Sequence, residues 1–174
     1  MDRIALGSMA YQTSLVDVTH PYLFLLYDEV VGNGDVRNLE TLRLIERLRG
    51  EVCVRLGLAA SPDSAALSSP AVPRVVLIHR RKVEEDCLRI SAISMGQAIA
   101  TVPVSAAMCL AAACHIPSTL PALNSADHAN SAELRVISIG ASLSASAAID
   151  PNGNIASVSV DRTVRTIMRG TAWI

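Results

Sequence analysis

The segment that decides the fold is SMGQAIATVPVSAAMCLAAACHIPSTLP, residues 94–121. From Val104 to Cys114 it has the composition of a helix, with five alanines, but it lacks a polar side. Pro103 stands just before this run and Pro117 follows soon after it, which favours a helix bounded by the two prolines. A helix without a polar face is buried on all sides. The remaining chain must therefore supply a curved sheet that wraps around it.

Strand signals fill much of the remaining chain. Residues 14–30 hold two apolar runs interrupted by Thr19-His20-Pro21, which indicates two strands joined by a turn or bulge. Two further runs, 74–80 and 87–96, flank a charged tip at 81–86 and predict a β-hairpin. After a polar loop, alternating runs return, with a strong turn signal at 150–154. The pattern predicts seven or eight strands.

One segment has the periodicity of an amphipathic helix. Between residues 36 and 58, apolar side chains recur every three or four positions, and Arg and Glu fill the other face. Asp35 is the expected N-cap, and the helix is expected to end near Gly57.

Bulk composition excludes several classes of protein. A chain of 174 residues suits one domain with a substantial core, and the net charge of −1, with both signs interspersed, excludes a nucleic-acid binder. The longest apolar run is shorter than a membrane span. Four cysteines without paired metal spacing, and no secretory leader, favour reduced thiols and a cytoplasmic location. A small-molecule partner is the remaining expectation.

Three blocks of the sequence resemble, in the same order, the carboxy-terminal half of the PrpF-like isomerases, which are relatives of diaminopimelate epimerase. These blocks are SLVDVTHPYLFL (14–25), RISAISMGQAIATVPVSAAMCLAAACHIPSTLP (89–121) and LRVISIGA with VDRTVRTIMRG (134–141 and 160–170). The resemblance spans about residues 14–170. It implies a single domain over 1–174, equivalent to one half of a family member.

The resemblance also implies the architecture and the chemistry. The expected fold class is α+β: a curved, mostly antiparallel sheet wrapped around a buried apolar helix, plus one amphipathic helix. Family members place their active site between two such halves and isomerise unsaturated di- and tricarboxylates by moving a proton, without a metal or an organic cofactor. The starts of the two central helices hold the substrate carboxylates.

In this chain the helix start that would bind a carboxylate is Ser105, Ala106 and Ala107. A helix N-terminus favours an anion because its backbone N–H groups lack partners and it carries about half a positive charge. Ser105 matches the threonine of the family's Thr-Gly pair, and Ala106 stands in place of the glycine. The family's histidines after Ser-Met-Gly are also absent, since Gln97 is followed by Ala98 and Ile99.

Three residues are candidates for proton transfer. His20 lies between two expected strands, where it is the best candidate for an acid or base, and the alternative is an ordinary loop histidine. Asp17 would orient His20, or would only close the turn. Cys109 follows Ser105 by one helical turn and is either a thiol acid–base or a small buried core residue.

Further polar positions complete the candidate site. Ser94, Gly96 and Gln97 come directly before the apolar helix and would bind a carboxylate or carbonyl oxygen, unless they only cap backbone groups. Lys82 is expected on the solvated hairpin tip. His115 and His128 show no metal-site spacing.

The sequence therefore predicts a cofactor-independent isomerase that moves a double bond by proton transfer alpha to a carbonyl in a small unsaturated acid or biosynthetic intermediate. A homodimer would rebuild the two-half cleft. One alternative keeps the pocket but uses it for cyclisation of a reactive intermediate. The other is a catalytically inactive half-domain that binds a partner.

Overall fold

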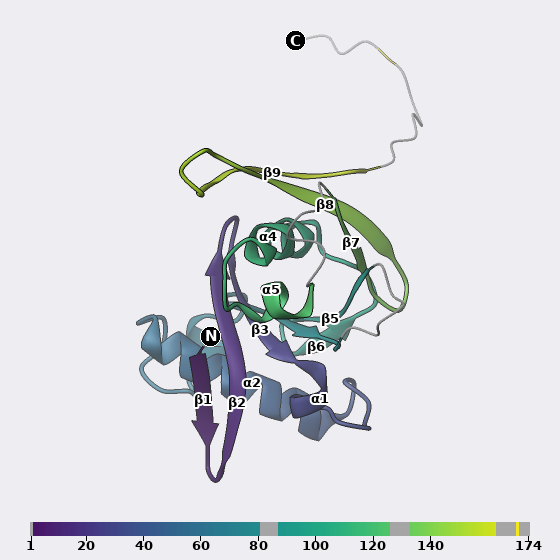
Figure 1. Cartoon of the computed structure of the whole chain (residues 1–174). Coiled ribbons are helices and arrows are strands. Elements are labelled where there is room, and N and C mark those ends of the chain that lie inside the picture. Colours follow the sequence, from purple (N-terminus) through teal and green to yellow (C-terminus); the bar gives the residue numbers. More distant parts are fainter. Residues whose placement is uncertain (1, 81–86, 126–132, 163–169, 171–174) are drawn as a thin grey trace.

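The computed structural model describes residues 2–80, 87–125, 133–162 and 170, and it shows an α+β fold built on an open, mixed sheet (Figure 1). Nine strands and five helices lie within this described part. The strands are β1 (Asp2–Leu6), β2 (Met9–Asp17), β3 (Pro21–Leu26), β4 (Arg74–Ile78), β5 (Leu88–Ser94), β6 (Gln97–Ile99), β7 (Leu134–Ile137), β8 (Ser142–Ile149) and β9 (Ile155–Val160). The helices are α1 (Tyr27–Val30), α2 (Leu39–Arg55), α3 (Ala65–Ser68), α4 (Val104–Cys114) and α5 (Leu120–Asn124).

The strands follow the order β1-β2-β3-β4-β5-β7-β8-β9, and β6 pairs with β5. Two pairings are parallel, β3 with β4 and β5 with β7, while the other six are antiparallel. The mostly antiparallel sheet is therefore confirmed. The strand count exceeds the expected seven or eight, because β1 begins before the block where the resemblance starts and because β6 is only three residues long.

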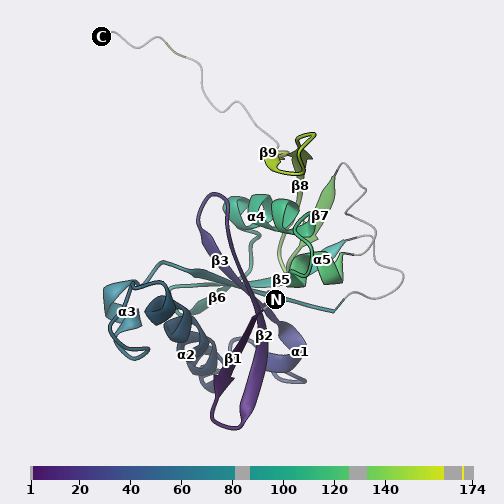
Figure 2. The ribbon, with the colours of Figure 1, turned by 60° about the vertical axis from the view of Figure 1, so that its left-hand side comes forward.

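Two helical layers cover the two faces of the sheet, as Figure 2 shows, with α1, α2 and α3 on one face and α4 and α5 on the other. Strands β3, β4 and β5 are almost wholly buried between these layers. Their alternate residues divide between two apolar cores: Phe24 and Val76 join the α4 core, whereas Leu25 and Leu77 join the α2 core. Continuous apolar runs in these strands follow from burial on both faces.

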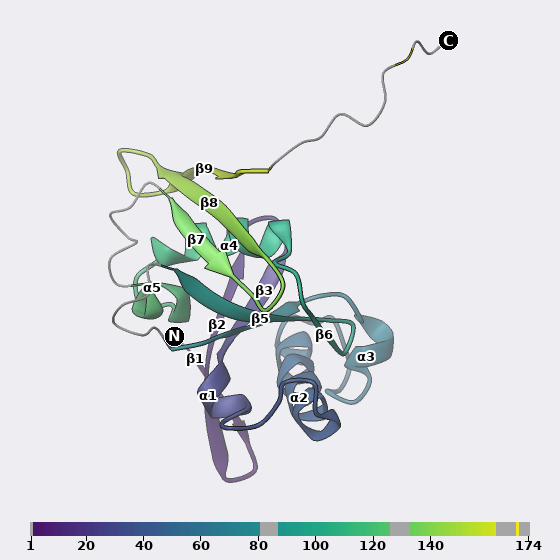
Figure 3. The ribbon, with the colours of Figure 1, turned by 90° about the vertical axis from the view of Figure 1, so that its right-hand side faces the viewer.

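Helix α4 is the core element that its sequence predicts. Eight of its eleven residues are buried, and β8 and β9 bend over it on the side away from β5 (Figures 1 and 3). The sheet does not close around the helix; it stays open, with β1 and β9 as its edges. The five alanines allow strands to approach the helix closely, since each adds only one methyl group to its surface.

Helix α2 begins later than its periodicity indicates. Its N-cap is Asn38, whose side chain accepts a hydrogen bond from the backbone N–H of Glu40, so the expected cap at Asp35 is wrong. Asp35 instead binds the guanidinium of Arg37, which lowers the pKa of the carboxyl to about 2. The helix ends at Arg55, and Gly57 follows in the left-handed region (φ 70°), as expected for a helix terminus.

The loop between α2 and β4 is fixed to α2 by a buried arginine. Arg49 is 5% exposed and donates hydrogen bonds to the backbone oxygens of Ser69 and Val72 and to the carboxylate of Glu46. Next to it, a Cβ on Gly50 would lie 2.6 Å from the carbonyl oxygen of Pro62. The glycine thus permits the loop to pack directly on the helix.

The structure shows the expected turn at 150–154 and the expected pairing of two strands around the charged tip, while other expected features fall outside the described residues. The turn at 150–154 connects β8 to β9, and the carboxylate of Asp150 accepts backbone hydrogen bonds from Asn152 and Asn154. Strands β4 and β5 form the expected antiparallel hairpin. The tip at 81–86 with Lys82, the loop residue His128 and the segment 163–169 lie outside the described residues.

Candidate functional site

Most of the residues expected at the site lie along one edge of the sheet, meaning here the boundary formed by the ends of the strands and not an edge strand. Strands β3 and β4 start at this edge, and the antiparallel strands β2 and β5 end there, so Asp17 and Ser94 lie near the same boundary. The turn that contains His20 joins β2 to β3 at this edge. Helix α4 also starts nearby, because Ser105 is hydrogen-bonded to the first residue of β4, as described next.

Ser105 is the centre of a small polar network at the start of α4. Its Oγ lies 2.8 Å from the hydroxyl oxygen of Tyr22, with either oxygen able to donate. The Nη1 of Arg74 donates a second hydrogen bond to the same Oγ over 3.3 Å. Tyr22 and Arg74 are register partners on the parallel strands β3 and β4, which explains why both side chains reach the helix. Tyr22 is 1% exposed, whereas Arg74 and Ser105 are partly accessible.

The electrostatics of this helix start favour an anion. Pro103 is the N-cap and provides no side-chain hydrogen bond to the first turn, which also contains no acidic residue. The first backbone N–H groups of a helix have no intrahelical acceptor and give its N-terminus a partial positive charge. A cation at this end is unfavourable by itself, yet Arg74 is placed there, and it forms no ion pair within the described part of the chain. An anionic ligand would accept hydrogen bonds from the guanidinium of Arg74 and from the N–H groups at the helix start that lack an acceptor.

His20 and Asp17 are exposed beside this network. Both lie at the junction of β2 and β3, and Asp17 pairs in register with Pro21 at the start of β3. The two side chains form no hydrogen bond with each other or with another described residue, so the structure gives Asp17 no orienting contact to His20. Their roles in proton transfer stay predictions.

Ala106, Ala107 and Cys109 lie inside the core. All three are fully buried, and the N–H of Ala107 already donates to the carbonyl of Pro103, so Ala107 offers no backbone donor to a ligand. The Sγ of Cys109 contacts the backbone oxygen of Val16 over 3.5 Å. Burial raises the pKa of this thiol to about 12, and the carboxylate of Asp17 adds to the increase. Such a thiol stays protonated near neutral pH, which supports its interpretation as a core residue.

Thiol labelling tests this burial. We expect that only Cys87, which is partly exposed, reacts rapidly with 5,5′-dithiobis(2-nitrobenzoate) in the folded protein at pH 8. The other three thiols are buried, and burial raises the pKa values of Cys53, Cys109 and Cys114. All four should react in denaturant. Rapid labelling of Cys109 in the folded state would contradict the core assignment.

The loop before α4 does not join the network at Ser105. Residues Ser94 and Gln97 are exposed register partners that flank the β5–β6 turn. Gly96 lines a cavity of about 290 Å³ with Glu46 and Arg49 of α2, on the opposite face of the sheet from α4. The three residues therefore lie at the same boundary of the sheet as Ser105 but take no part in its polar network.

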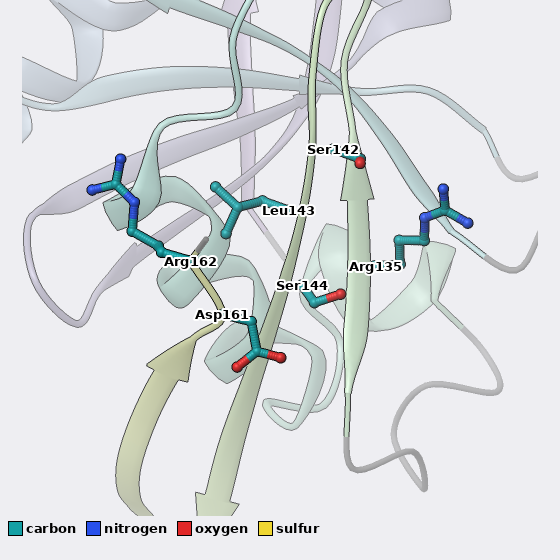
Figure 4. A pocket seen from close by; sticks show the side chains of 6 residues that line it. All are labelled: Arg135, Ser142, Leu143, Ser144, Asp161 and Arg162. Atoms are coloured by element: carbon teal, nitrogen blue, oxygen red, sulfur yellow. The ribbon is translucent and has the colours of Figure 1, made fainter. Parts of the chain in front are cut away.

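Another cavity, of about 320 Å³, lies over β7, β8 and the end of β9. Figure 4 shows Arg135 on one side of β8 and Arg162 on the other, where Arg162 lies on the same side as Leu143. The two guanidinium groups point away from each other. This cavity therefore lacks the convergent donors that binding of an anion requires.

The described residues contain no group of three His, Cys, Asp or Glu side chains that could hold a metal ion. His115 is the C-cap of α4, remote from the helix start. Across the same residues, we find no helix with the length and apolar character needed to cross a membrane.

Sequence reasoning missed Arg74 and Tyr22. They are 31 and 83 positions away from Ser105 in the chain, and only the parallel pairing of β3 with β4 makes them neighbours. The one available signal is that each polar side chain stands at the start of an otherwise apolar strand.

Comparisons with known proteins agree with this fold. A 3-methylitaconate isomerase from Eubacterium barkeri is 26% identical over 179 residues, which cover 92% of this chain and 47% of that protein. The crystal structure of a methylitaconate-delta-isomerase superposes with a TM-score of 0.81 at 22% identity, over 99% of this chain and 52% of that one. The chain thus spans about half the length of these relatives. The PrpF protein family matches residues 4–174, and the chain belongs to this family.

Proposed function

We propose that this protein is a cofactor-independent isomerase that moves a double bond in a small unsaturated carboxylic acid, or in a biosynthetic intermediate with such a group. The observation that carries the proposal is the position of Arg74 beside the start of α4, where it forms no ion pair with another described residue and no side chain caps the helix. Family membership and the similarity to a 3-methylitaconate isomerase support the reaction type.

The site supports binding of a carboxylate through three kinds of donor. Arg74 supplies a guanidinium that fits a carboxylate through two parallel N–H bonds. Ser105 supplies a hydroxyl, and the first turn of α4 supplies backbone N–H groups. Tyr22 holds Ser105 in place through the 2.8 Å hydrogen bond between their oxygens.

The reaction requires removal of a proton from the carbon next to the double bond and its return to the far end of the allylic system. The electron pair released by the first step spreads onto the carboxylate or carbonyl oxygen, where Arg74 and the helix start stabilise negative charge. His20 is the proposed base, since it is exposed at the same edge of the sheet. Asp17 is the nearest acidic residue along β2.

A second copy of the chain would complete the cleft. The chain spans about half of each relative, and the network at Ser105 lies where the strands β3 and β4 begin. We infer a homodimer in which two such edges face each other about a two-fold axis.

Deuterium exchange tests the reaction. The protein is incubated with methylitaconate, and separately with an aconitate-type acid, in deuterium oxide, and the acids are followed by proton NMR. We expect isomerisation of at least one acid with deuterium incorporation at the carbon that receives the proton. His20→Ala should abolish turnover, and Arg135→Met, a substitution on the exposed face of β7, should not.

Two results would contradict the proposal. Absence of both product and deuterium with acids that bind would favour an inactive binding half-domain. Consumption of a reactive intermediate into a cyclic product without deuterium incorporation would favour the cyclase interpretation. Near-normal turnover by His20→Ala would remove His20 as the base while leaving the reaction class intact.

A further inference from the structure

We propose that Ser91 and His79 form a nucleophile–base pair that cleaves a small ester or thioester, at a site separate from the start of α4. The Nε2 of His79 lies 3.0 Å from the Oγ of Ser91, and both residues line a cavity of about 310 Å³. A hydroxyl within hydrogen-bond distance of an imidazole, at the wall of a cavity, is the geometry that activates a serine. The inference does not depend on the isomerase proposal.

The pair lies at the opposite end of the strands from Arg74. Strand β4 begins with Arg74, and His79 directly follows its last residue, so roughly 16 Å of extended chain separates the two. Ser91 is the register partner of Leu77, which belongs to the α2 core, so Ser91 faces α2 and not α4. A small acid bound at Ser105 would therefore not reach Ser91.

A fork in the sheet accounts for the space beside Ser91. On the side away from β4, β5 pairs with β7 at Leu88 and Arg89 and with β6 from Ala92 to Ser94. Ile90 and Ser91 lie between these two pairings and, in the described part of the sheet, have register partners only on β4. Ser91 is 8% exposed and lines two cavities, so the little surface that it exposes borders space that a ligand can occupy.

A stacked tyrosine holds the imidazole of His79 in place. The rings of His79 and Tyr27 have centroids 3.9 Å apart and planes 21° apart. The hydroxyl of Tyr27 donates to the backbone oxygen of Gly34 over 3.4 Å, which ties the tyrosine to the loop after α1. In the tautomer with its proton on Nδ1, the imidazole accepts the serine hydroxyl at Nε2. Stacking restricts rotation of the ring and keeps Nε2 directed at Ser91.

The walls of the two cavities indicate the substrate class. The cavities adjoin, because they share Val36, Arg37, Ile90, Ser91 and Ile139. The smaller one, of about 110 Å³, continues along the apolar residues 98–100 and suits a short acyl chain. Arg89 and Arg37, which binds Asp35, line the larger cavity. An arginine beside a reacting carbonyl stabilises the negative charge that develops on its oxygen. The expected substrate is an ester or thioester of a short apolar acid.

The proposed reaction is acyl transfer to water. The Oγ of Ser91 attacks the carbonyl carbon while its proton passes to the Nε2 of His79, and the tetrahedral intermediate then releases the alcohol or thiol, which takes that proton. Water next attacks the acyl carbon and gives a proton to His79. The acid leaves as the Oγ of Ser91 recovers this proton. Each step moves a proton and electron pairs only, so the sequence balances without an oxidant or a reductant.

Covalent labelling of the full chain tests the pair. The protein is treated with phenylmethanesulfonyl fluoride, and its peptides are analysed by mass spectrometry. We expect sulfonylation of Ser91 in the folded protein and none of Ser146, a more exposed serine on β8 whose hydroxyl is paired with that of Ser159. His79→Gln keeps a side chain that can hydrogen-bond to Ser91, yet it should slow the labelling at least about 100-fold, since a general base contributes that much or more.

Hydrolysis of p-nitrophenyl acetate gives a second readout. Ser91→Ala should lower the rate to that of the unfolded chain, and Ser146→Ala should leave it unchanged. Absence of the label at Ser91, or a rate of hydrolysis that Ser91→Ala does not change, would overturn the proposal. Labelling that His79→Gln leaves at the wild-type rate would overturn the pair, because the serine would then react without its base. None of these measurements uses an unsaturated acid, so failure of the isomerase proposal is distinguishable.

Discussion

Replacement of Arg49 by methionine is expected to lower the free energy of unfolding by about 2–3 kcal/mol, the upper part of the range for leaving a buried polar group without its hydrogen-bond partner. The guanidinium is held in a nearly closed environment and donates to the backbone oxygens of Ser69 and Val72. Methionine fills a similar volume but donates no hydrogen bond. The backbone oxygen of Ser69 would lose its donor and Glu46, which is partly exposed, would lose its ion pair, whereas the oxygen of Val72 would keep the hydroxyl of Ser69.

Urea unfolding followed by circular dichroism measures this loss. Arg55→Met is the matched control, because Arg55 lies on the exposed end of the same helix and its loss should cost less than about 1 kcal/mol. Arg49→Lys should fall between the two, since lysine keeps the charge but not the planar fork that reaches several acceptors. Equal midpoints for Arg49→Met and Arg55→Met would show that the loop at 61–73 packs on α2 without the guanidinium.

The buried helix was predictable because its cause is local. A run of eleven residues without a polar side has only one stable environment, and the structure places it between the sheet and the bend formed by β8 and β9. The same holds for α2, whose apolar face follows directly from its periodicity. The hydrophobic pattern does not show whether the sheet closes around the helix. Whether a sheet closes around a helix or stays open depends on pairings between distant strands.

The error at the start of α2 has a simple physical cause. Asp35 and Asn38 are both suitable caps, and periodicity alone does not distinguish them. The neighbouring Arg37 decides between them, because it binds the carboxylate of Asp35 and removes it from competition for the backbone N–H groups of the helix. Asn38 then caps Glu40.

The candidate site was only partly predictable for a different reason. Ser105 could be found from the helix start and from the family pattern, but its partners could not. Arg74 reaches Ser105 because β4 crosses to lie parallel to β3, and nothing near position 74 in the sequence indicates that pairing. Conversely, Ala107 and Cys109 share the helix with Ser105 and are nevertheless enclosed in the core, since a helix turns its successive residues to different sides.

Replacement of Arg74 by methionine is expected to weaken binding of a carboxylate substrate by about 10- to 150-fold, the equivalent of about 1.5–3 kcal/mol for a hydrogen bond to a charged group. Isothermal titration with methylitaconate, or with whichever acid the NMR assay identifies, measures the change. Without ligand the variant should be at least as stable as the wild type, because it removes a cation from the positive end of α4.

The combination of these two readouts separates an anchor from a structural residue. If Arg74 served the fold, Arg74→Met would lose stability, and its binding defect would follow from unfolding. If it serves the ligand, affinity falls while the urea midpoint holds, and Arg74→Lys recovers part of the affinity through its charge. Arg135→Met should change neither quantity, since Arg135 is exposed on β7 and alternates with Leu134 and Val136, which join the α4 core. Wild-type affinity in Arg74→Met would refute the proposed carboxylate site, because the guanidinium would then contribute nothing to binding of the ligand.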